Sequence, residues 1–374
     1  MDPQDGALIA HPSAHRPVET MAVSPEAIVY AQGALAPSTW AAYTADWARF
    51  TRWCQDQDVD PLPVGPAVLV EYIASHAKLV DDDGRPTYSP ATISRWISSI
   101  NAVHAREGMA APGAHPQVKV VLAGVRRLSG AARPTRRVAP LMRDDLAHVL
   151  QVAREGTYPG GVHAARDACL LLFGFVGAFR REELSRLRVA DVTRHRDDGL
   201  HVKVRRSKTD QESRGAVKAL PYGQRPITCA PCAFVRWVHV LDAGHERAQV
   251  MAAVFEVAGG AGHVCRAPEF EAHSLDGDRP LFPVVHRSGR VQPDAMGGHG
   301  VNLVVKRRTM AAGLDASRFG GHSMRAGFVT QAVRAGASSL EVMRQTQHTN
   351  PATVAVYSRD NDPLAGNAVT RLGL

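Results

Sequence analysis

The sequence predicts a mainly α-helical protein of two domains, the second of which also carries a small β-sheet and so belongs to the α+β class. Three observations support this prediction. The chain has 374 residues, which exceeds the usual size of a single compact core. Apolar residues recur at three- and four-residue steps along much of it, as in amphipathic helices. One stretch after residue 200 instead alternates polar and apolar residues, as strands do.

Residues 34–128 are predicted to form a small, all-helical domain. It follows a leader, residues 1–33, whose prolines and alanines show no sustained periodicity and predict a flexible segment. The first expected helix is capped by Ser38 and has an aromatic face of Trp40, Tyr43, Trp47 and Phe50. The second, at Ala67–His76, buries Val68, Leu69, Tyr72 and Ile73. The third starts at Ser89-Pro90, buries Ile93, Trp96, Ile100 and Val103 and stops at Gly108, and the fourth spans Gln117–Leu128.

A basic linker, residues 129–139, separates this domain from a larger one at residues 140–374. The segment SGAARPTRRVAP, residues 129–140, is rich in Gly, Pro and Arg, as suits an exposed connection that lies along phosphates. The larger domain is expected to begin with a helix at Asp144–Ala153 and to contain a strongly apolar helix at Asp167–Phe179. The stretches HVKVRRSKTD and AVKALPYG then predict a hairpin or three-stranded sheet.

Two later segments are less regular. Residues 243–280 contain Gly and His with weak periodicity and are interpreted as an insertion or a long loop. Residues 363–374 form a C-terminal tail in which Ala365, Ala368, Val369 and Leu372 have helical spacing. This tail could pack on a neighbouring protomer or fold back on its own domain, and the sequence favours neither.

The five cysteines form an odd and sparse set, which argues against a disulfide framework. Cys229 and Cys232 form a CxxC motif, but no second pair follows at a zinc-finger spacing, and Cys265 stands alone in a Gly-rich stretch. We therefore interpret Cys229 and Cys232 as ordinary residues that open a helix, with structural zinc as the less favoured alternative. No metal site and no cofactor are predicted.

The formal net charge of +8 favours a polyanionic partner, although many basic proteins bind no nucleic acid. The leader carries Asp2, Asp5, Glu19 and Glu26 against Arg16 alone, so the basic surplus lies in the foldable part of the chain. The sequence shows neither an apolar run of bilayer length nor a secretory signal, which predicts a cytoplasmic protein that contacts no membrane.

Four motifs in the larger domain carry residues suited to phosphoryl transfer. They are Arg180 in GAFRREEL (residues 177–184), Lys208 in RSKTDQ at the strand turn, His322 and Arg325 in GHSMRAGF, and His348 with Tyr357 in QTQHTNPATVAVYSR. Arginine forks can neutralise a phosphate in its transition state, tyrosine can act as the nucleophile, and lysine can protonate a leaving oxygen. Taken singly, each motif has an ordinary structural explanation, such as a surface salt bridge, a soluble turn or a core aromatic.

The order Arg, Lys, His-x-x-Arg, His, Tyr resembles the catalytic signature of the tyrosine recombinases. GAFRREEL resembles the first-arginine box of that family, RSKTDQ its β-hairpin lysine box, and the run from Arg290 to Arg359 is similar to the phage-integrase type. The helical domain at 34–128 also resembles the family's core-binding, SAM-like DNA-binding domain. The resemblance therefore covers nearly the whole foldable chain and implies a C-shaped clamp closed around duplex DNA.

This resemblance implies a role for each matching residue. Arg180 and Arg325 would bind the non-bridging oxygens of the scissile phosphate, and Tyr357 would attack phosphorus to form a 3′-phosphotyrosyl link. Lys208 would protonate the 5′ leaving oxygen, while His322 and His348 would position the phosphate and assist proton transfer. Glu183 matches the acidic residue that supports the first arginine. No GxxxxGK[ST] loop is present, so we expect a reaction without ATP or magnesium.

The chain departs from the family pattern before the second histidine, where members usually have Gly at a tight helix junction. This chain has Gln347 there, which makes the role of His348 the least secure. Residues 243–280 also lack a counterpart in the family.

The resemblance also implies partners: double-stranded recombination sites, a homotetramer on synapsed DNA, and scope for an accessory DNA-bending or directionality factor. DNA-bound protein would then associate with the bacterial nucleoid. The arginines expected to contact DNA are Arg126, Arg127, Arg133, Arg136, Arg137, Arg205 and Arg206.

Three rival functions share parts of this pattern. A type IB topoisomerase would use the same residues to relax supercoils, and the compact integrase-like arrangement favours recombination over it. A non-catalytic DNA-binding protein of the same fold is disfavoured because every candidate position holds a competent residue. A zinc-dependent DNA-binding regulator would depend on Cys229 and Cys232 alone.

Overall fold

The computed structural model describes most of the chain outside its two ends: residues 37–132, 138–154, 157–205, 215–244, 246–258, 262–267, 273–352, 354, 369 and 372. The chain divides into two compact units, Met1–Arg136 and Arg137–Leu374. The division lies within residues 129–139. The predicted leader, the arginines Arg133, Arg136 and Arg137, and nearly all of the predicted tail lie outside the described residues.

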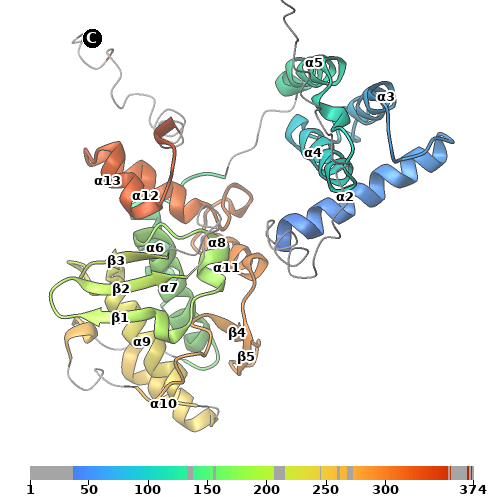
Figure 1. Cartoon of the computed structure of the whole chain (residues 1–374). Helices are drawn as coiled ribbons and strands as arrows, with labels where there is room; N and C mark the ends of the chain where they lie inside the picture. The colour runs from blue at the N-terminus through green and yellow to red at the C-terminus, as the bar shows by residue number, and fades with distance from the viewer. Residues whose placement is uncertain are drawn as a thin grey trace, which may run out of the picture. The chain divides into compact units, whose positions relative to one another are not determined.

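The first unit consists of helices (Figure 1). These are α2 (Pro37–Asp56), α3 (Pro66–Ala77), α4 (Pro90–Arg106), the short η1 (Pro112–Ala114) and α5 (Pro116–Ala132). Helix α2 packs against α4, and α3 packs against α5. The four predicted helices are confirmed, but α2 begins at Pro37, so Ser38 lies inside the helix rather than at its cap, and α5 extends four residues beyond the predicted end at Leu128.

Helix α4 shows how the local sequence sets these elements. The Ser89 side chain accepts a hydrogen bond from the Thr92 backbone N–H, and Pro90 follows at the first helical position. Ile93, Trp96 and Ile100 are buried as predicted, but Val103 is only half-buried. His104 completes the buried stripe instead: its Nδ1 donates to the Ile100 carbonyl, and its Nε2 accepts from the Val64 N–H at 3.0 Å.

An aromatic cluster fills the centre of the first unit. The side chains of Phe50, Tyr72 and Trp96 are almost completely buried, and the Phe50 and Tyr72 rings meet edge to face with centroids 5.0 Å apart. Trp40 and Tyr43, from the same predicted aromatic face as Phe50, are only half-buried. Burial of aromatic surface thus accounts for much of the stability of this small unit.

The second unit is also mainly helical. Its helices are α6 (Arg143–Val152), α7 (Gly160–Val176), α8 (Arg181–Ser185), α9 (Ala230–Asp242), α10 (Arg247–Ala258), α11 (Gly298–Ala311), α12 (Ser323–Arg334) and α13 (Ser339–Thr346), with short 3₁₀ turns η2 (Val189–Asp191), η3 (Pro226–Thr228), η4 (Val264–Arg266) and η6 (Ala316–Arg318). Helix α7 is buried along most of its length and packs against α9, α10 and α12. It is the centre of the core of this unit.

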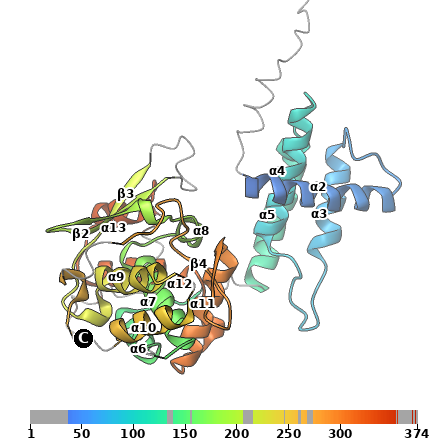
Figure 2. The ribbon, with the colours of Figure 1, turned by 90° about the horizontal axis from the view of Figure 1, so that it is seen from below.

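A three-stranded antiparallel sheet lies on one side of these helices (Figures 1 and 2). Its strands are β1 (Val192–His195), β2 (Gly199–Val204) and β3 (Ala216–Leu220), in the order β1-β2-β3. Val204 pairs with Ala216, so β2 and β3 form the predicted hairpin. A second sheet pairs β4 (Pro283–Val285) with β5 (Val291–Ala295).

The structure corrects two predictions. The apolar helix, predicted at Asp167–Phe179, is α7 at Gly160–Val176. It begins before the predicted start, and it ends before Phe179 because Ala178 adopts a left-handed backbone conformation with φ of 46°. Residues 243–280 are not a long loop, since they contain helix α10 and the turn η4, whereas the alternative, an insertion, stays a prediction. The α10 sequence concealed its helix because it is apolar on every side: Val254 is buried, whereas Phe255 remains 77% exposed.

In the part of the chain that the structure describes, we find no helix both long and apolar enough to cross a membrane.

Candidate active site

Arg180 lies at the junction between α7 and α8, where it precedes the first residue of α8. The carboxylate of Glu183 accepts two hydrogen bonds from it, one from Nη1 at 2.6 Å and one from the backbone N–H at 3.0 Å. Glu183 is buried, with 3% of its side chain exposed, whereas the Arg180 side chain is 19% exposed. Glu183 therefore fixes the start of α8 and the direction of the guanidinium group together.

The backbone just before Arg180 joins three parts of the site. Because Ala178 has a positive φ, its carbonyl turns away from the α7 axis and accepts hydrogen bonds from two cations. Arg325 Nη1 donates to it at 2.6 Å, and Lys218 Nζ donates at 3.2 Å. Lys218 also donates to the Gly177 carbonyl at 2.8 Å. The end of α7 is thus held to both β3 and α12.

Lys218 is a site residue that the sequence analysis missed. Its side chain is fully buried, with Nζ 3.7 Å from Glu183 Oε2 and over the Phe179 ring. Burial lowers the pKa of Lys218 to about 7, with the nearby arginines acting in the same direction and Glu183 opposing them. The strand pattern of β3 held a signal: Lys218 points inward like Leu220, whereas the preceding Val217 is on the opposite face and is 65% exposed.

Arg325 connects α12 to the end of α13. It is 1% exposed, and besides the Ala178 carbonyl its guanidinium donates from Nη2 to the Thr346 carbonyl at 2.5 Å. His322 stands three residues earlier, at the N-cap of α12. Part of the His322 surface is open to solvent, yet crowding by protein atoms and the charges of nearby arginines lower its pKa.

His348 follows α13 directly and is oriented by Thr346. The Thr346 hydroxyl donates to the Val342 carbonyl at 2.8 Å and so accepts from His348 Nδ1 at 3.0 Å. Partial burial, Arg325 and Arg180 lower the pKa of His348 to about 4. At neutral pH the His348 imidazole is therefore uncharged, with the proton on Nδ1.

Gln347 occupies the tight junction between α13 and His348. Its backbone is left-handed, with φ of 57° and ψ of 40°, a conformation that costs a non-glycine residue energy. The departure from Gly at this position is thus a real backbone strain, but the chain still makes the turn that brings His348 back to Arg325 and Arg180.

The structure brings four of the six predicted catalytic residues together: Arg180, His322, Arg325 and His348. Lys208 and Tyr357 lie outside the described residues, as does Arg206. Lys208 belongs to the connection between β2 and β3. Val354, three positions before Tyr357, is buried against α12 and α13.

Three of the predicted DNA-contacting arginines are among the described residues: Arg126, Arg127 and Arg205. Arg126 and Arg127 are exposed on α5, and Arg126 donates to the Ser94 hydroxyl at 3.2 Å. Arg205, at the end of β2, forms an ion pair with the buried Asp191 at 2.6 Å. Part of the Arg205 charge is therefore already compensated within the fold.

The assembled cluster is suited to bind an anion. Arg180 and Arg325 supply two fixed positive charges, and the carboxylate of Glu183 is already engaged by Arg180 and Lys218. The two neutral histidines add polar groups without further charge. A single phosphodiester, with one negative charge and two non-bridging oxygens, matches this set of donors.

Comparisons with known proteins agree with the fold. The solved structures that resemble the chain include the Tn1549 transposon integrase in complex with transposon right end DNA, with a TM-score of 0.51, 16% identity, and 93% of this chain and 97% of that chain covered. The XerH recombinase bound to a difH substrate has a TM-score of 0.50 and 16% identity over 82% of this chain and 72% of that chain. At these identities the likeness concerns the fold. No family model matches the chain.

Two curated proteins align along almost the entire chain. An integrase/recombinase described as a xerD homolog from Selenomonas ruminantium is 28% identical over 340 residues, covering 90% of this chain and 86% of the relative. Recombinase cre of Escherichia phage P1 is 22% identical over 340 residues, with 91% and 88% covered. The chain is similar along most of its length to tyrosine recombinases. It is accordingly an enzyme of DNA strand cleavage and joining, with the mainly α, small-sheet fold that was predicted.

Two of the sequence motifs can be located in the fold. GAFRREEL spans the α7–α8 junction, and the His-x-x-Arg motif lies at the start of α12. The two motifs meet at one backbone carbonyl, that of Ala178.

Proposed function

We propose that this recombinase cuts and rejoins DNA at specific sites through a 3′-phosphotyrosyl bond to Tyr357. In this proposal Arg180 and Arg325 bind the non-bridging oxygens of the scissile phosphate. Tyr357 attacks phosphorus, the bond to the 5′ oxygen breaks, and Lys208 gives that oxygen its proton. The phosphotyrosyl bond retains the energy of the broken diester, so the reverse attack by a 5′-hydroxyl rejoins the strand.

One observation carries this proposal: the charges of Arg180, at the α7–α8 junction, and of Arg325, on α12, both lower the pKa of His348. Arg325 also donates a hydrogen bond to the carbonyl of Ala178, two residues before Arg180. Arg180 and Arg325 are separated by more than a hundred positions in the sequence, and the fold brings them to one site. Two fixed arginines can stabilise the charge that develops on a pentavalent phosphorus.

The histidines take roles that neutral imidazoles can fill. Because His348 carries its proton on Nδ1, its Nε2 can accept a hydrogen bond at the pH of the cell. We assign His348 to orienting the phosphate or accepting the tyrosine proton, and His322 to donating to a phosphate oxygen. Neither role requires a charged imidazole.

The rest of the chain would bring DNA to this site. We assign residues 34–128 to core DNA binding, residues 129–139 to a basic linker along the phosphates, and residues 140–374 to catalysis, with the two domains closing as a clamp. Exposed arginines such as Arg126 and Arg127 would make binding strongly dependent on salt. We further propose a tetramer on synapsed sites, an accessory DNA-bending or directionality factor, and a nucleoid-associated cytoplasmic location.

The test is covalent trapping on DNA that the protein selects for itself. Tyr357→Phe protein is used to enrich binding sites from random duplexes, and nicked suicide versions of these sites are then incubated with each variant. We expect wild-type protein to form an adduct that survives denaturing electrophoresis, with the DNA joined through its 3′ end to the peptide that contains Tyr357. Tyr357→Phe should bind the same duplex and form no adduct.

A matched control is Tyr222→Phe, which alters a tyrosine outside the cluster whose hydroxyl donates to the His195 carbonyl. It should form the adduct at the wild-type rate. An adduct that persists in Tyr357→Phe, or one that maps to another residue, would refute the assignment of the nucleophile. Relaxation of supercoiled DNA that lacks the selected site, at the rate seen with the site, would favour topoisomerase activity.

A further inference from the structure

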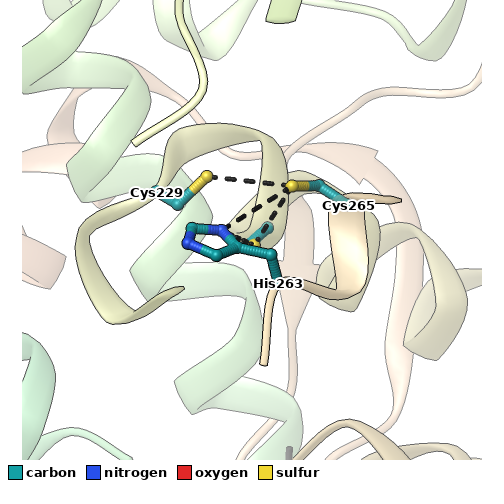
Figure 3. Close-up of side chains that lie close together, drawn as sticks. Cys229, His263 and Cys265 are labelled. Atoms are coloured by element: carbon teal, nitrogen blue, oxygen red, sulfur yellow. Dashed lines mark hydrogen bonds between the residues drawn. The ribbon is translucent and has the colours of Figure 1, made fainter. Parts of the chain in front are cut away.

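Four potential metal ligands converge beside the N-terminus of α9. Cys229 precedes the first residue of α9, Cys232 lies in its first turn, and His263 and Cys265 come from the turn η4 (Figure 3). Their ligand atoms, three sulfurs and one imidazole nitrogen, all lie within 4.8 Å of one another. The prediction that Cys265 stands alone is therefore wrong: it meets Cys229 and Cys232 across more than thirty residues of chain.

The spacing of these atoms fits a tetrahedral zinc ion. Zinc bonds of about 2.3 Å to sulfur and about 2.0–2.1 Å to nitrogen place ligand atoms about 3.5–3.8 Å apart. Cys265 Sγ is 3.9 Å from Cys229 Sγ and 3.3 Å from Cys232 Sγ. His263 Nδ1 is 3.3 Å from Cys232 Sγ and 4.0 Å from Cys265 Sγ. The sulfur separations exceed a disulfide bond of about 2.05 Å, and all five cysteines are free thiols.

The surroundings orient the ligands as metal sites require. His263 Nε2 donates to the Gln224 carbonyl at 3.3 Å, which leaves the lone pair on Nδ1, the atom that faces the sulfurs. The Gly223 N–H donates to Cys229 Sγ at 3.3 Å, a contact that stabilises a thiolate. A Cβ at position 223 would lie 2.8 Å from Cys229 Cα, so this approach needs glycine.

The burial and charge of the cysteine ligands also favour a bound zinc ion. The three cysteines are buried, where separate thiolates would be unstable without a cation. Three thiolates with one Zn²⁺ leave a net charge of −1. Arg236, four residues after Cys232, lies on the same face of α9 and can balance that charge.

We propose that Cys229, Cys232, His263 and Cys265 form a structural zinc site. Four protein ligands fill a tetrahedral shell and leave no position for substrate, so the ion would stabilise the fold rather than take part in DNA cleavage. It would close the chain between Cys232 and His263, which contains α10, and fasten the segment 243–280 to the loop that leaves β3. The sequence did not reveal the site because its second half is His-x-Cys rather than a zinc-finger pair, and because the weak periodicity of residues 243–280 does not indicate helix α10.

The experiment measures metal in the full-length protein. The chain is produced in zinc-supplemented medium, purified without chelators, and analysed by elemental mass spectrometry. We expect one zinc per chain in the wild type, and loss of most of it in Cys232→Ser and in His263→Gln. Cys169→Ala, which removes a buried thiol of α7 outside the cluster, is the matched control and should keep its zinc. Slow removal of the metal with a chelator should lower the melting temperature of the wild type.

Cobalt(II) provides a second readout if a variant does not fold. Wild-type protein produced with cobalt should show the thiolate charge-transfer bands and the strong visible absorption of a tetrahedral site. Wild-type protein with no bound metal, or with a disulfide between two of these cysteines, would overturn the proposal. Zinc that stays at one per chain in both Cys232→Ser and His263→Gln would overturn it as well, because the ion would then lie elsewhere.

Discussion

Gln347 is the residue at which this chain departs from the family pattern, and the structure gives the departure a physical meaning. The position requires a left-handed backbone, which glycine adopts freely and glutamine does not. The turn nevertheless forms, because Thr346 on one side is held by Arg325 and by His348. The favourable free energy of these hydrogen bonds offsets the cost of the strained backbone at Gln347.

We therefore predict that Gln347→Gly stabilises the protein by about 1 kcal/mol, the usual cost of left-handed backbone in a residue with a side chain. Chemical denaturation of the isolated chain measures this change. Gln331→Gly is the control: it lies in the middle of α12 and should destabilise the protein by about 1 kcal/mol. A loss of stability in Gln347→Gly would mean that the Gln347 side chain makes contacts that outweigh the strain.

Lys218 gives a second prediction, which depends on pH. Its pKa is about 7 in the folded protein and about 10.5 when the chain is unfolded. Between these values the unfolded state binds the extra proton, so the penalty for burying Lys218 is complete below pH 7 and fades as the pH rises towards 10.5. The stability of the wild type relative to Lys218→Met should thus increase from about pH 7 to about pH 10.

Denaturation curves of both proteins across this pH range provide the measurement. Lys203→Met on the exposed face of β2 is the matched control, and its stability relative to the wild type should not change in this way. A flat difference between wild type and Lys218→Met would show that Lys218 keeps an ordinary pKa in the fold.

Four residues of the cluster could be named from the sequence, and their catalytic roles stay a prediction. Arg180, Arg325, His322 and His348 were identifiable because their order in the chain is specific to one family. Lys218 was not, because it is not part of the family signature. The only indication in the sequence was that the alternation of β3 places this lysine on the inward face. The zinc ligand set was missed for a different reason: contacts between residues far apart in the chain are not visible in local spacing.

Among the elements, α12 lies in unusually close contact with the chain before α6. Gly327 lies in its middle, two residues after Arg325, and any Cβ there would overlap the carbonyl oxygen of Leu141. The Leu141 N–H donates to the Ser323 carbonyl at 2.9 Å, so the chain before α6 runs directly along this helix. The glycine permits this close approach, which sets the depth at which Arg325 and His322 lie.

We predict that Gly327→Ala destabilises the protein by about 1–3 kcal/mol, the usual cost of forcing extra volume into a packed core. The displaced helix should also slow DNA cleavage. Gly124→Ala on α5 is the control: a Cβ there meets no atom within 4 Å, and the helix interior should gain about 0.5–1 kcal/mol. Thermal unfolding measures the change in stability of each variant. If Gly327→Ala were stabilised as much as Gly124→Ala, the packing argument would be refuted.

Element by element, periodicity predicted the helices with an apolar stripe, such as α4, and the alternating strands of the β2–β3 hairpin. It failed where the pattern was uniform or where backbone geometry decided the end. Helix α10 is apolar all round, and α7 ends at a left-handed alanine that no residue type announces. Both failures have the same origin: the local sequence permits several outcomes, and tertiary packing selects one.

At the scale of the whole molecule, two compact units and one cationic cluster fit a protein that handles duplex DNA. The central claim is that the arginines of the cluster neutralise the scissile phosphate. Arg180 is the best position to test it. If Arg180 is shortened, Glu183 keeps its hydrogen bond from the backbone of residue 180 and its contact with Lys218, so the fold should survive.

The decisive measurement is single-turnover cleavage of the selected site by wild type and Arg180→Ala, on DNA with either a normal phosphodiester or a charge-neutral methylphosphonate at the cleaved position. We predict that Arg180→Ala loses about 100-fold or more on the phosphodiester, as when one oxyanion donor is removed, and much less on the methylphosphonate, which has no charge to neutralise. An equal loss on both substrates would contradict the assignment of Arg180 to the phosphate.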